Sequence, residues 1–226
     1  KKFRFAPPRE VADTARMLQQ AGARYLYVTD STYNGSYEHS LKVAAAFKKA
    51  GISIPWGGLF VPTAPPPDYY SILADAGLMH VEFGTETLSN RVLESYGKPF
   101  QIDDVFSSHR EALTAGLHVA HYLMLGGPGE NKDTLKETLA NADRLEKTAF
   151  FVFSGIRIYP HTALYDLALE EGQIEPNWNP LEPRFYWSPA LHRETVMELM
   201  KNHAGSRSNW IVGSGSKQAV QEYCEA

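Results

Sequence analysis

The feature that most constrains the fold is a helix-like segment followed by a strand-like segment, repeated five times along the chain. Each strand-like segment is rich in β-branched and aromatic residues, and each follows a stretch with apolar residues at helical spacing. The predicted strands cover residues 24–30, 52–61, 78–84, 117–125 and 150–160. Strict alternation of this kind is typical of crossover connections. We therefore expect an α/β fold whose parallel strands neighbour one another in chain order.

The repeat length of roughly 25 to 40 residues fits either a (β/α) barrel or a doubly wound sheet, and periodicity does not choose between them. Polar residues offer a second indication, because they gather where several of the predicted strands end. Contributions from several strands favour a barrel-type site at the carboxyl ends of the strands. The polar residues at these positions are Asp30, Ser31, Asn34, Glu82, Thr85, Glu86, His121, Arg157, Tyr159 and His161.

Composition excludes several classes of protein. With 226 residues, of which 43% are hydrophobic, the chain can bury a sizeable core, and its net charge of -4 shows no basic footprint for nucleic acid or for a membrane surface. No apolar run is long enough to cross a bilayer, and the first residues lack the apolar core of a signal peptide. We expect a soluble, cytoplasmic protein. Its single cysteine, Cys224, can form neither an internal disulfide nor a cysteine metal site.

Three of the polar residues have structural interpretations beside functional ones. Asp30, followed by "STYNGS", fits a cap or a turn as well as a binding loop. Glu82 lies in an apolar strand, where an unpaired carboxylate costs several kcal/mol, so it needs a ligand or an ion-pair partner such as Arg157. His121 lies alone in an apolar run and fits a hydrogen-bonded core residue better than a ligand-binding one.

A glycine-rich turn follows the fourth predicted strand in the segment "YLMLGGPGENKDT". The turn comprises residues 126–129, and residues 130–133 begin the next predicted helix. Glycine allows positive φ and lets a flat ligand lie against the backbone, although a tight strand-to-helix turn needs the same residues. The segment has neither the G-x-G-x-x-G spacing of a dinucleotide site nor the lysine of a P-loop, so by itself the turn leaves both interpretations open.

Taken together, four segments resemble successive strands and turns of the radical S-adenosylmethionine (radical SAM) superfamily. They are "VTDSTYN", "VEFGTETLSNRVLESYGK", "GLHVAHYLMLGGPGENKDTLKETL" and "RIYPHTALYDLALEEG". The resemblance covers about residues 1–172 and is greatest to the branch of methylthiotransferases and cobalamin-binding radical enzymes. It implies a partial (β/α)6 TIM-type barrel with parallel strands that binds S-adenosylmethionine and a [4Fe-4S] cluster. Cobalamin in a separate domain is a further expectation from this branch.

The resemblance also implies roles for residues at the strand ends. Asp30 and Ser31 occupy the position where the family strand approaches the methionine moiety. Thr85 and Glu86 occupy the position of polar contacts to the ribose. A second set, from strands that line the family barrel, is expected near the cofactor or the substrate: Glu82 and Arg157.

Two later segments match the family positions around the adenine. Gly126, Gly127 and Pro128 match the turn that packs near the purine, so the glycines would make room for it. Residues 158–160, which include Tyr159, match the last family strand, whose backbone groups pair with the adenine edge.

One departure from the family pattern is large. The defining C-x-x-x-C-x-x-C segment, which supplies three thiolates to the cluster, is absent. Cys224 alone cannot replace it. We interpret the chain as a piece that lacks the first strand and the cluster loop, and we expect it to be redox-inactive as written, with no metal ligands of its own. A missing N-terminal domain is consistent with this interpretation.

Beyond residue 172 the helix and strand alternation stops. We therefore predict a barrel over 1–172 and a C-terminal extension over 173–226. The extension reads as a proline-rich extended wrap, an amphipathic helix over 190–205 and a tail of uncertain order. Within the wrap, Tyr186 and Trp187 fit core packing better than a substrate pocket.

The function expected from this combination is that of a fragment of a radical SAM enzyme with an unknown small-molecule or macromolecular substrate. Two alternatives come from other classes. A glycosidase-type barrel hydrolase would pair Asp30 with Glu82 or Glu86. A catalytically inactive scaffold would bind a partner chain along an open sheet edge.

Overall fold

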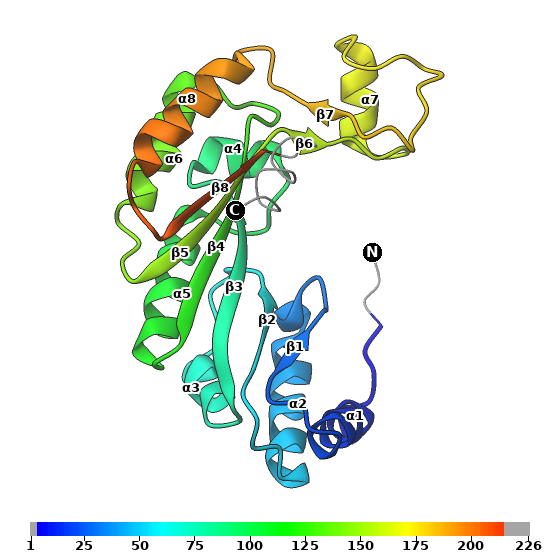
Figure 1. The fold of residues 1–226 in the computed structure, drawn as a ribbon, viewed down its shortest axis with the longest axis vertical. Helices are drawn as coiled ribbons and strands as arrows, with labels where there is room; N and C mark the ends of the chain where they lie inside the picture. Colours follow the sequence, from blue (N-terminus) through cyan, green and yellow to red (C-terminus); the bar gives the residue numbers. More distant parts are fainter. Residues whose placement is uncertain (1–3, 215–226) are drawn as a thin grey trace. The chain divides into compact units, whose positions relative to one another are not determined.

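The computed structural model describes residues 4–214. Its helices, shown in Figure 1, are α1 (Pro8–Gln20), the 3-10 helix η1 (Tyr33–Gly35), α2 (Tyr37–Ala50), α3 (Tyr69–Ala74), α4 (Asn90–Ser95), α5 (Ile102–Thr114), α6 (Lys132–Ala142), α7 (Ala163–Glu170) and α8 (Arg193–Ala204). The strands are β1 (Leu26–Val28), β2 (Trp56–Phe60), β3 (Leu78–Glu86), β4 (His118–Leu125), β5 (Thr148–Ser154), β6 (Ile156–Arg157), β7 (Phe185–Tyr186) and β8 (Trp210–Ser214). Within residues 4–214, no helix is both long enough and apolar enough to cross a membrane.

The main sheet has the strand order β1-β2-β3-β4-β5-β8. Strand β2 pairs in parallel with β1 and with β3, so that Trp56 lies opposite both Leu26 and Leu78. Strand β5 pairs in parallel with β8, with Phe150 opposite Trp210. The predicted α/β class and the chain order of the first five strands are therefore confirmed.

The chain divides into two compact units. Among the described residues, the first comprises 4–85, 99–121 and 145–149, and the second comprises 86–98, 122–144 and 150–214. In the first unit, α1 and α2 pack together over an apolar core that includes Phe47, Trp56, Phe60, Val81 and Phe83. Alternate residues of β3 enter this core, which places the residues between them, including His80 and Glu82, on the opposite face of the sheet.

The fifth predicted strand, over 150–160, is wrong at its end. Strand β5 stops at Ser154, and Gly155 adopts a positive φ of 76° that breaks the extended run. Residues Ile156 and Arg157 form β6, which pairs antiparallel with β7 in a separate two-stranded sheet. Trp187 packs against Gly155, where a Cβ atom would lie 3.0 Å from the indole ring, so both the positive φ and the close contact favour glycine at the break.

The C-terminal extension, up to residue 214, contains more regular secondary structure than its composition indicated. The predicted helix is confirmed as α8, with Val196 and Met200 buried. Part of the predicted tail, Trp210–Ser214, forms β8 and extends the main sheet beside β5. The rest of that tail, including Cys224, lies outside the described residues. The proposed domain boundary at residue 172 stays a prediction.

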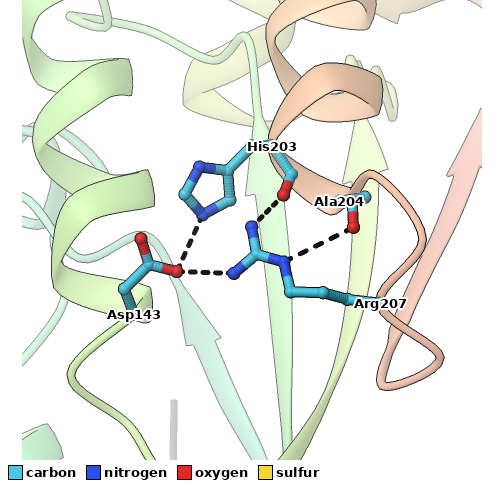
Figure 2. Close-up of polar contacts among 4 residues, drawn as sticks. All are labelled: Asp143, His203, Ala204 and Arg207. Carbon is cyan, nitrogen blue, oxygen red and sulfur yellow. Dashed lines mark hydrogen bonds and ion pairs between the residues drawn. The ribbon is translucent and has the colours of Figure 1, made fainter.

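A polar cluster links α6 to the turn between α8 and β8 in the second unit (Figure 2). The carboxylate oxygen Oδ1 of Asp143 lies 2.7 Å from Nη1 of Arg207 and 3.1 Å from Nε2 of His203. The Arg207 guanidinium also donates to the backbone carbonyls of His203 and Ala204, and it lies 5.0 Å above the ring of Trp210. These contacts fix the start of β8.

Candidate functional site

The predicted site residues fall into two groups, one in each unit. Asp30, Ser31, Glu82 and Thr85 belong to the first unit. The second unit holds the other predicted residues: Glu86, Gly126, Gly127, Pro128, Arg157 and Tyr159.

In the first unit, Asp30 and Ser31 are exposed in the loop after β1. The loop is held by Asn34, which is buried and bonds twice to the backbone at the end of β2. Its Nδ2 donates to the carbonyl of Val61 at 2.8 Å, and its Oδ1 accepts from the Val61 N–H at 2.9 Å. The structure therefore brings the loop after β1 to the carboxyl end of β2, as expected for a site at the strand ends.

Glu82 has close partners on neighbouring positions of the same sheet face. Its Oε1 lies 3.1 Å from Nε2 of His80, and its Oε2 accepts a hydrogen bond from the Tyr27 hydroxyl at 2.8 Å. The sequence correctly indicated that this carboxylate needs a partner, but it suggested Arg157 rather than His80 and Tyr27. The placement of Glu82 near cofactor or substrate stays a prediction.

Thr85 belongs to a buried polar chain. Its hydroxyl lies 2.7 Å from Nδ1 of His121, Nε2 of His121 lies 3.0 Å from Nδ1 of His109, and Nε2 of His109 lies 3.0 Å from the carbonyl of Glu146. Burial lowers the pKa of both histidines, and the neighbouring His109 lowers that of His121 further. His121 is thus a hydrogen-bonded core residue, as predicted. The expected ribose contact of Thr85 stays a prediction, and its side chain is fully buried.

In the second unit, four of the six predicted residues line one cavity of about 560 Å³: Glu86, Pro128, Arg157 and Tyr159. Apolar side chains from β4, β6 and α7 complete much of its wall: Met124, Ile156, Leu164 and Leu167. A volume of this size, with a largely apolar wall and a few polar groups, is typical of small-molecule sites.

Charged groups concentrate at one part of this cavity. Glu86 lies 2.7 Å from Nζ of Lys98, and both side chains are about one-quarter exposed. Glu86 also has a φ of 66°, a conformation that a residue with a side chain adopts at a cost of about 1 kcal/mol or more. The Arg157 guanidinium lies 5.0 Å above the ring of Tyr159. Lys98 could not be recognised as a site residue from the sequence, because it follows α4 rather than a strand.

The glycine turn shapes this wall through close packing. Gly126 and Gly129 have positive φ, whereas Gly127 does not. A Cβ atom at Gly127 would lie 2.1 Å from the Tyr96 hydroxyl oxygen and 2.4 Å from Cδ1 of Ile156, and both of those residues line the cavity. The absence of a side chain at Gly127 therefore allows Tyr96 and Ile156 to pack against this turn. The expected contact of these glycines with a purine stays a prediction.

Glu130 is a further polar residue beside the glycine turn, and it was not among the predicted site residues. Its side chain is fully buried, Oε2 accepts a hydrogen bond from the Gly126 N–H, and Oε1 has no hydrogen-bond partner among residues 4–214. Burial raises the pKa of this carboxyl to about 7. The only signal in the sequence was its position directly after the turn, which the predicted helix start at 130 explained equally well. Helix α6 in fact begins at Lys132, with Asn131 as its N-cap.

Comparison with known proteins decides the family. The sequence model of the Radical SAM superfamily matches residues 1–142. The chain belongs to this superfamily. Among curated proteins, the chain is 29% identical over 133 residues to the heme chaperone HemW of Bacillus subtilis, covering 58% of this chain and 33% of HemW. It is 22% identical over 171 residues to an uncharacterised methyltransferase of Pyrococcus horikoshii, covering 75% of this chain and 37% of that protein.

Solved radical SAM structures share the fold. The methyltransferase TsrM from Kitasatospora setae, solved with cobalamin and a [4Fe-4S] cluster, aligns with a TM-score of 0.77 at 17% identity, over 91% of this chain and 48% of TsrM. Coproporphyrinogen III oxidase HemN from Escherichia coli aligns with a TM-score of 0.61 at 12% identity, over 91% of this chain and 48% of HemN. The radical SAM partial-barrel fold predicted from the sequence is confirmed.

This radical SAM chain spans about a third of the length of the curated relatives it matches. Membership in the family does not favour the hydrolase or the inactive scaffold. The residues of this chain do not fit a [4Fe-4S] cluster, because such a cluster takes thiolate ligands and the sequence holds one cysteine.

Proposed function

We propose that this chain is part of an enzyme that binds S-adenosylmethionine and cleaves it reductively at a [4Fe-4S] cluster to start radical chemistry on a substrate. Family membership supports the class of enzyme. The observation that carries the assignment to this chain is the cavity of the second unit, which gathers Glu86, Pro128, Arg157 and Tyr159 from three segments of the chain. The cluster ligands are not assigned to this chain.

The chemistry of the cavity fits the nucleoside part of S-adenosylmethionine. Met124, Ile156 and Leu167 supply an apolar wall of the kind that a purine packs against. The Glu86 carboxylate can accept hydrogen bonds from the two ribose hydroxyls, because an ionised carboxylate has four acceptor positions and Lys98 is bonded only to Oε1 among the contacts described. Arg157 can pair with an anionic group of the cofactor or of the substrate.

Several further features belong to the whole protein. TsrM and the radical enzyme OxsB are solved with cobalamin, and this supports cobalamin as a second cofactor, held by a domain other than the one described. We also propose a cytoplasmic location. The net charge of -4 argues against a nucleic-acid partner, because the chain has no excess of positive charge to meet phosphates.

Calorimetric titration of the chain with S-adenosylmethionine tests the cavity. Glu86→Gln and Arg157→Ala should each weaken binding about tenfold or more, because each removes a charge-assisted hydrogen bond. Arg184→Ala is the matched control, since Arg184 is exposed and lines a different cavity. Equal affinity in the parent, both cavity variants and the control would refute this location for the cofactor.

A further inference from the structure

Four side chains of the first unit form a continuous hydrogen-bonded chain on the face of the sheet opposite the apolar core. The Tyr25 hydroxyl lies 2.8 Å from Nδ1 of His80, and Nε2 of His80 lies 3.1 Å from Oε1 of Glu82. The Tyr27 hydroxyl donates to Oε2 of the same carboxylate at 2.8 Å. Tyr27 lies in β1 and Tyr25 directly precedes that strand, whereas His80 and Glu82 lie in β3. These hydrogen bonds therefore pass over β2, which lies between those strands in the sheet.

The direction of these hydrogen bonds follows from their chemistry. An ionised carboxylate only accepts, so His80 donates its Nε2–H to Glu82. The neutral imidazole then has an acceptor at Nδ1, and the Tyr25 hydroxyl donates its proton there. The order of groups, a hydroxyl, a base and a carboxylate that orients the base, is the one that enables a hydroxyl to lose its proton.

Strand β2 makes room for this contact with a glycine. A Cβ atom at Gly57 would lie 2.3 Å from Cε1 of His80, 2.3 Å from the Tyr25 hydroxyl oxygen and 2.5 Å from Nδ1 of His80. Glycine weakens the interior of a strand and is typical of positions where another group must approach closely. The hydrogen bond between Tyr25 and His80 thus depends on Gly57, although glycine is unfavourable in the interior of a strand such as β2.

Exposure differs between the hydroxyls and the base. Tyr25 is 38% exposed and Tyr27 is 42% exposed, whereas the side chains of His80 and Glu82 are 24% and 16% exposed. A ligand can therefore reach the tyrosines while the imidazole and the carboxylate stay shielded. Burial, followed by the charge of Glu82, raises the pKa of Tyr25, so its hydroxyl keeps its proton at neutral pH unless a base accepts it.

We propose that Tyr25, His80 and Glu82 form a proton relay for a substrate group that carries an exchangeable proton on oxygen or nitrogen. In the forward step, the bond between that proton and the substrate atom breaks and a bond to the Tyr25 oxygen forms. The original Tyr25 proton passes to Nδ1 of His80, and Glu82 stabilises the imidazolium. The reverse step returns a proton to the substrate. The relay goes beyond the proposed function, because no part of it requires S-adenosylmethionine or a cluster.

The roles within the relay are distinct. Tyr25 would be the catalytic residue, because it alone contacts the substrate atom. His80 and Glu82 are positioning residues that act through Tyr25, and Tyr27 orients the carboxylate through its own hydrogen bond.

Acylation by p-nitrophenyl acetate tests the relay, with the modified tyrosines located by peptide mass spectrometry of the full chain. Tyr25 should be acylated faster than Tyr27, because its proton acceptor is an imidazole rather than a carboxylate. His80→Gln should slow acylation of Tyr25 by about 100-fold, which is typical of the loss of a general base. Tyr27 should change about twofold at most in the same variant.

Two further measurements keep the test decisive. Gly57→Ala should slow acylation of Tyr25 as His80→Gln does, because the added methyl group separates Tyr25 from His80. Nitrogen NMR of the parent should show His80 protonated at Nε2 and not at Nδ1. An unchanged Tyr25 rate in a folded His80→Gln or Gly57→Ala variant, or a parent His80 protonated at Nδ1, would reduce the cluster to a cross-strand structural contact and overturn the proposal.

Discussion

The two units each bury polar side chains, but they satisfy them differently. In the first unit, Thr85, His121 and His109 pass hydrogen bonds in series to the carbonyl of Glu146, and every imidazole nitrogen has a partner. In the second unit, the buried carboxylate of Glu130 has one oxygen bonded to Gly126, while the other has no hydrogen-bond partner among the described residues. A complete network stabilises one core arrangement, whereas a half-satisfied carboxylate costs free energy that the surrounding structure must offset.

The pKa directions follow the same difference. Burial lowers the pKa of His109 and His121, which keeps both neutral and suited to a relay of single hydrogen bonds. Burial raises the pKa of Glu130 to about 7, which places its titration near neutral pH. The buried histidines therefore reduce the free energy of unfolding as pH falls. Glu130 reduces it as pH rises.

The largest effect is expected for His121→Ala. The change leaves a cavity and removes the partner of both the Thr85 hydroxyl and Nδ1 of His109, so we expect a loss of about 4 kcal/mol in the free energy of unfolding. His118→Ala is the control, because His118 lies on the same strand and is exposed. Urea denaturation measures both. A loss below about 1 kcal/mol for His121→Ala would show that the network is not what stabilises this core.

The next effect concerns Glu130 and pH. Its folded-state pKa of about 7 lies above the ordinary value of 4.5, so its contribution to stability is fully present below pH 4.5 and is lost as pH rises through 7. The rise of the pKa from 4.5 to about 7 corresponds to about 3 kcal/mol in the free energy of unfolding. Glu130→Gln should remove this loss, and the variant should be more stable than the parent at pH 8.

Urea denaturation between pH 4.5 and 8 measures this difference. Because the lowered pKa values of His109 and His121 act in the other direction, the loss of stability on acidification should persist in Glu130→Gln. Parallel pH profiles for the parent and the variant would mean that Glu130 does not titrate in this range.

The sequence predicted what depends on local pattern. Alternation of helix and strand periods predicted the parallel order of β1 to β5, and three of the polar residues at strand ends, Glu86, Arg157 and Tyr159, share one cavity. The need of Glu82 for a partner was also evident. Its partner His80 lies two residues earlier on the same strand, where the two-residue period puts both side chains on one face.

What the sequence could not give depends on contacts between distant segments. Strand β8 was read as part of a tail because five residues carry little signal until β5 provides a partner. The break at Gly155 required knowledge that Trp187 packs there. Glu130 looked like an ordinary first-turn acid, and only tertiary packing shows that it is buried.

A smaller loss of stability is expected for a substitution in the glycine turn beside Glu130. In Gly127→Ala the new methyl group meets Tyr96 and Ile156, so we expect a loss of about 1 to 3 kcal/mol from overpacking. Gly84→Ala is the matched control, because a Cβ atom there meets only the Phe60 carbonyl at an ordinary 3.9 Å. Thermal melts measure both, and equal melting temperatures would mean that the turn tolerates side chains and that Tyr96 moves aside freely.

The smallest effect is expected where a polar cluster is neither buried nor incomplete. Asp143 is 47% exposed, and its partners His203 and Arg207 are reached by solvent as well (Figure 2). Exposed ion pairs contribute little because water screens them, so Asp143→Ala should cost about 0.5 to 1 kcal/mol, and 1 M salt should reduce the difference between the parent and the variant. Denaturation at low and high salt measures both quantities. A loss above about 2 kcal/mol that salt leaves unchanged would show that completeness of a network, rather than its burial, determines what it contributes to the stability of this chain.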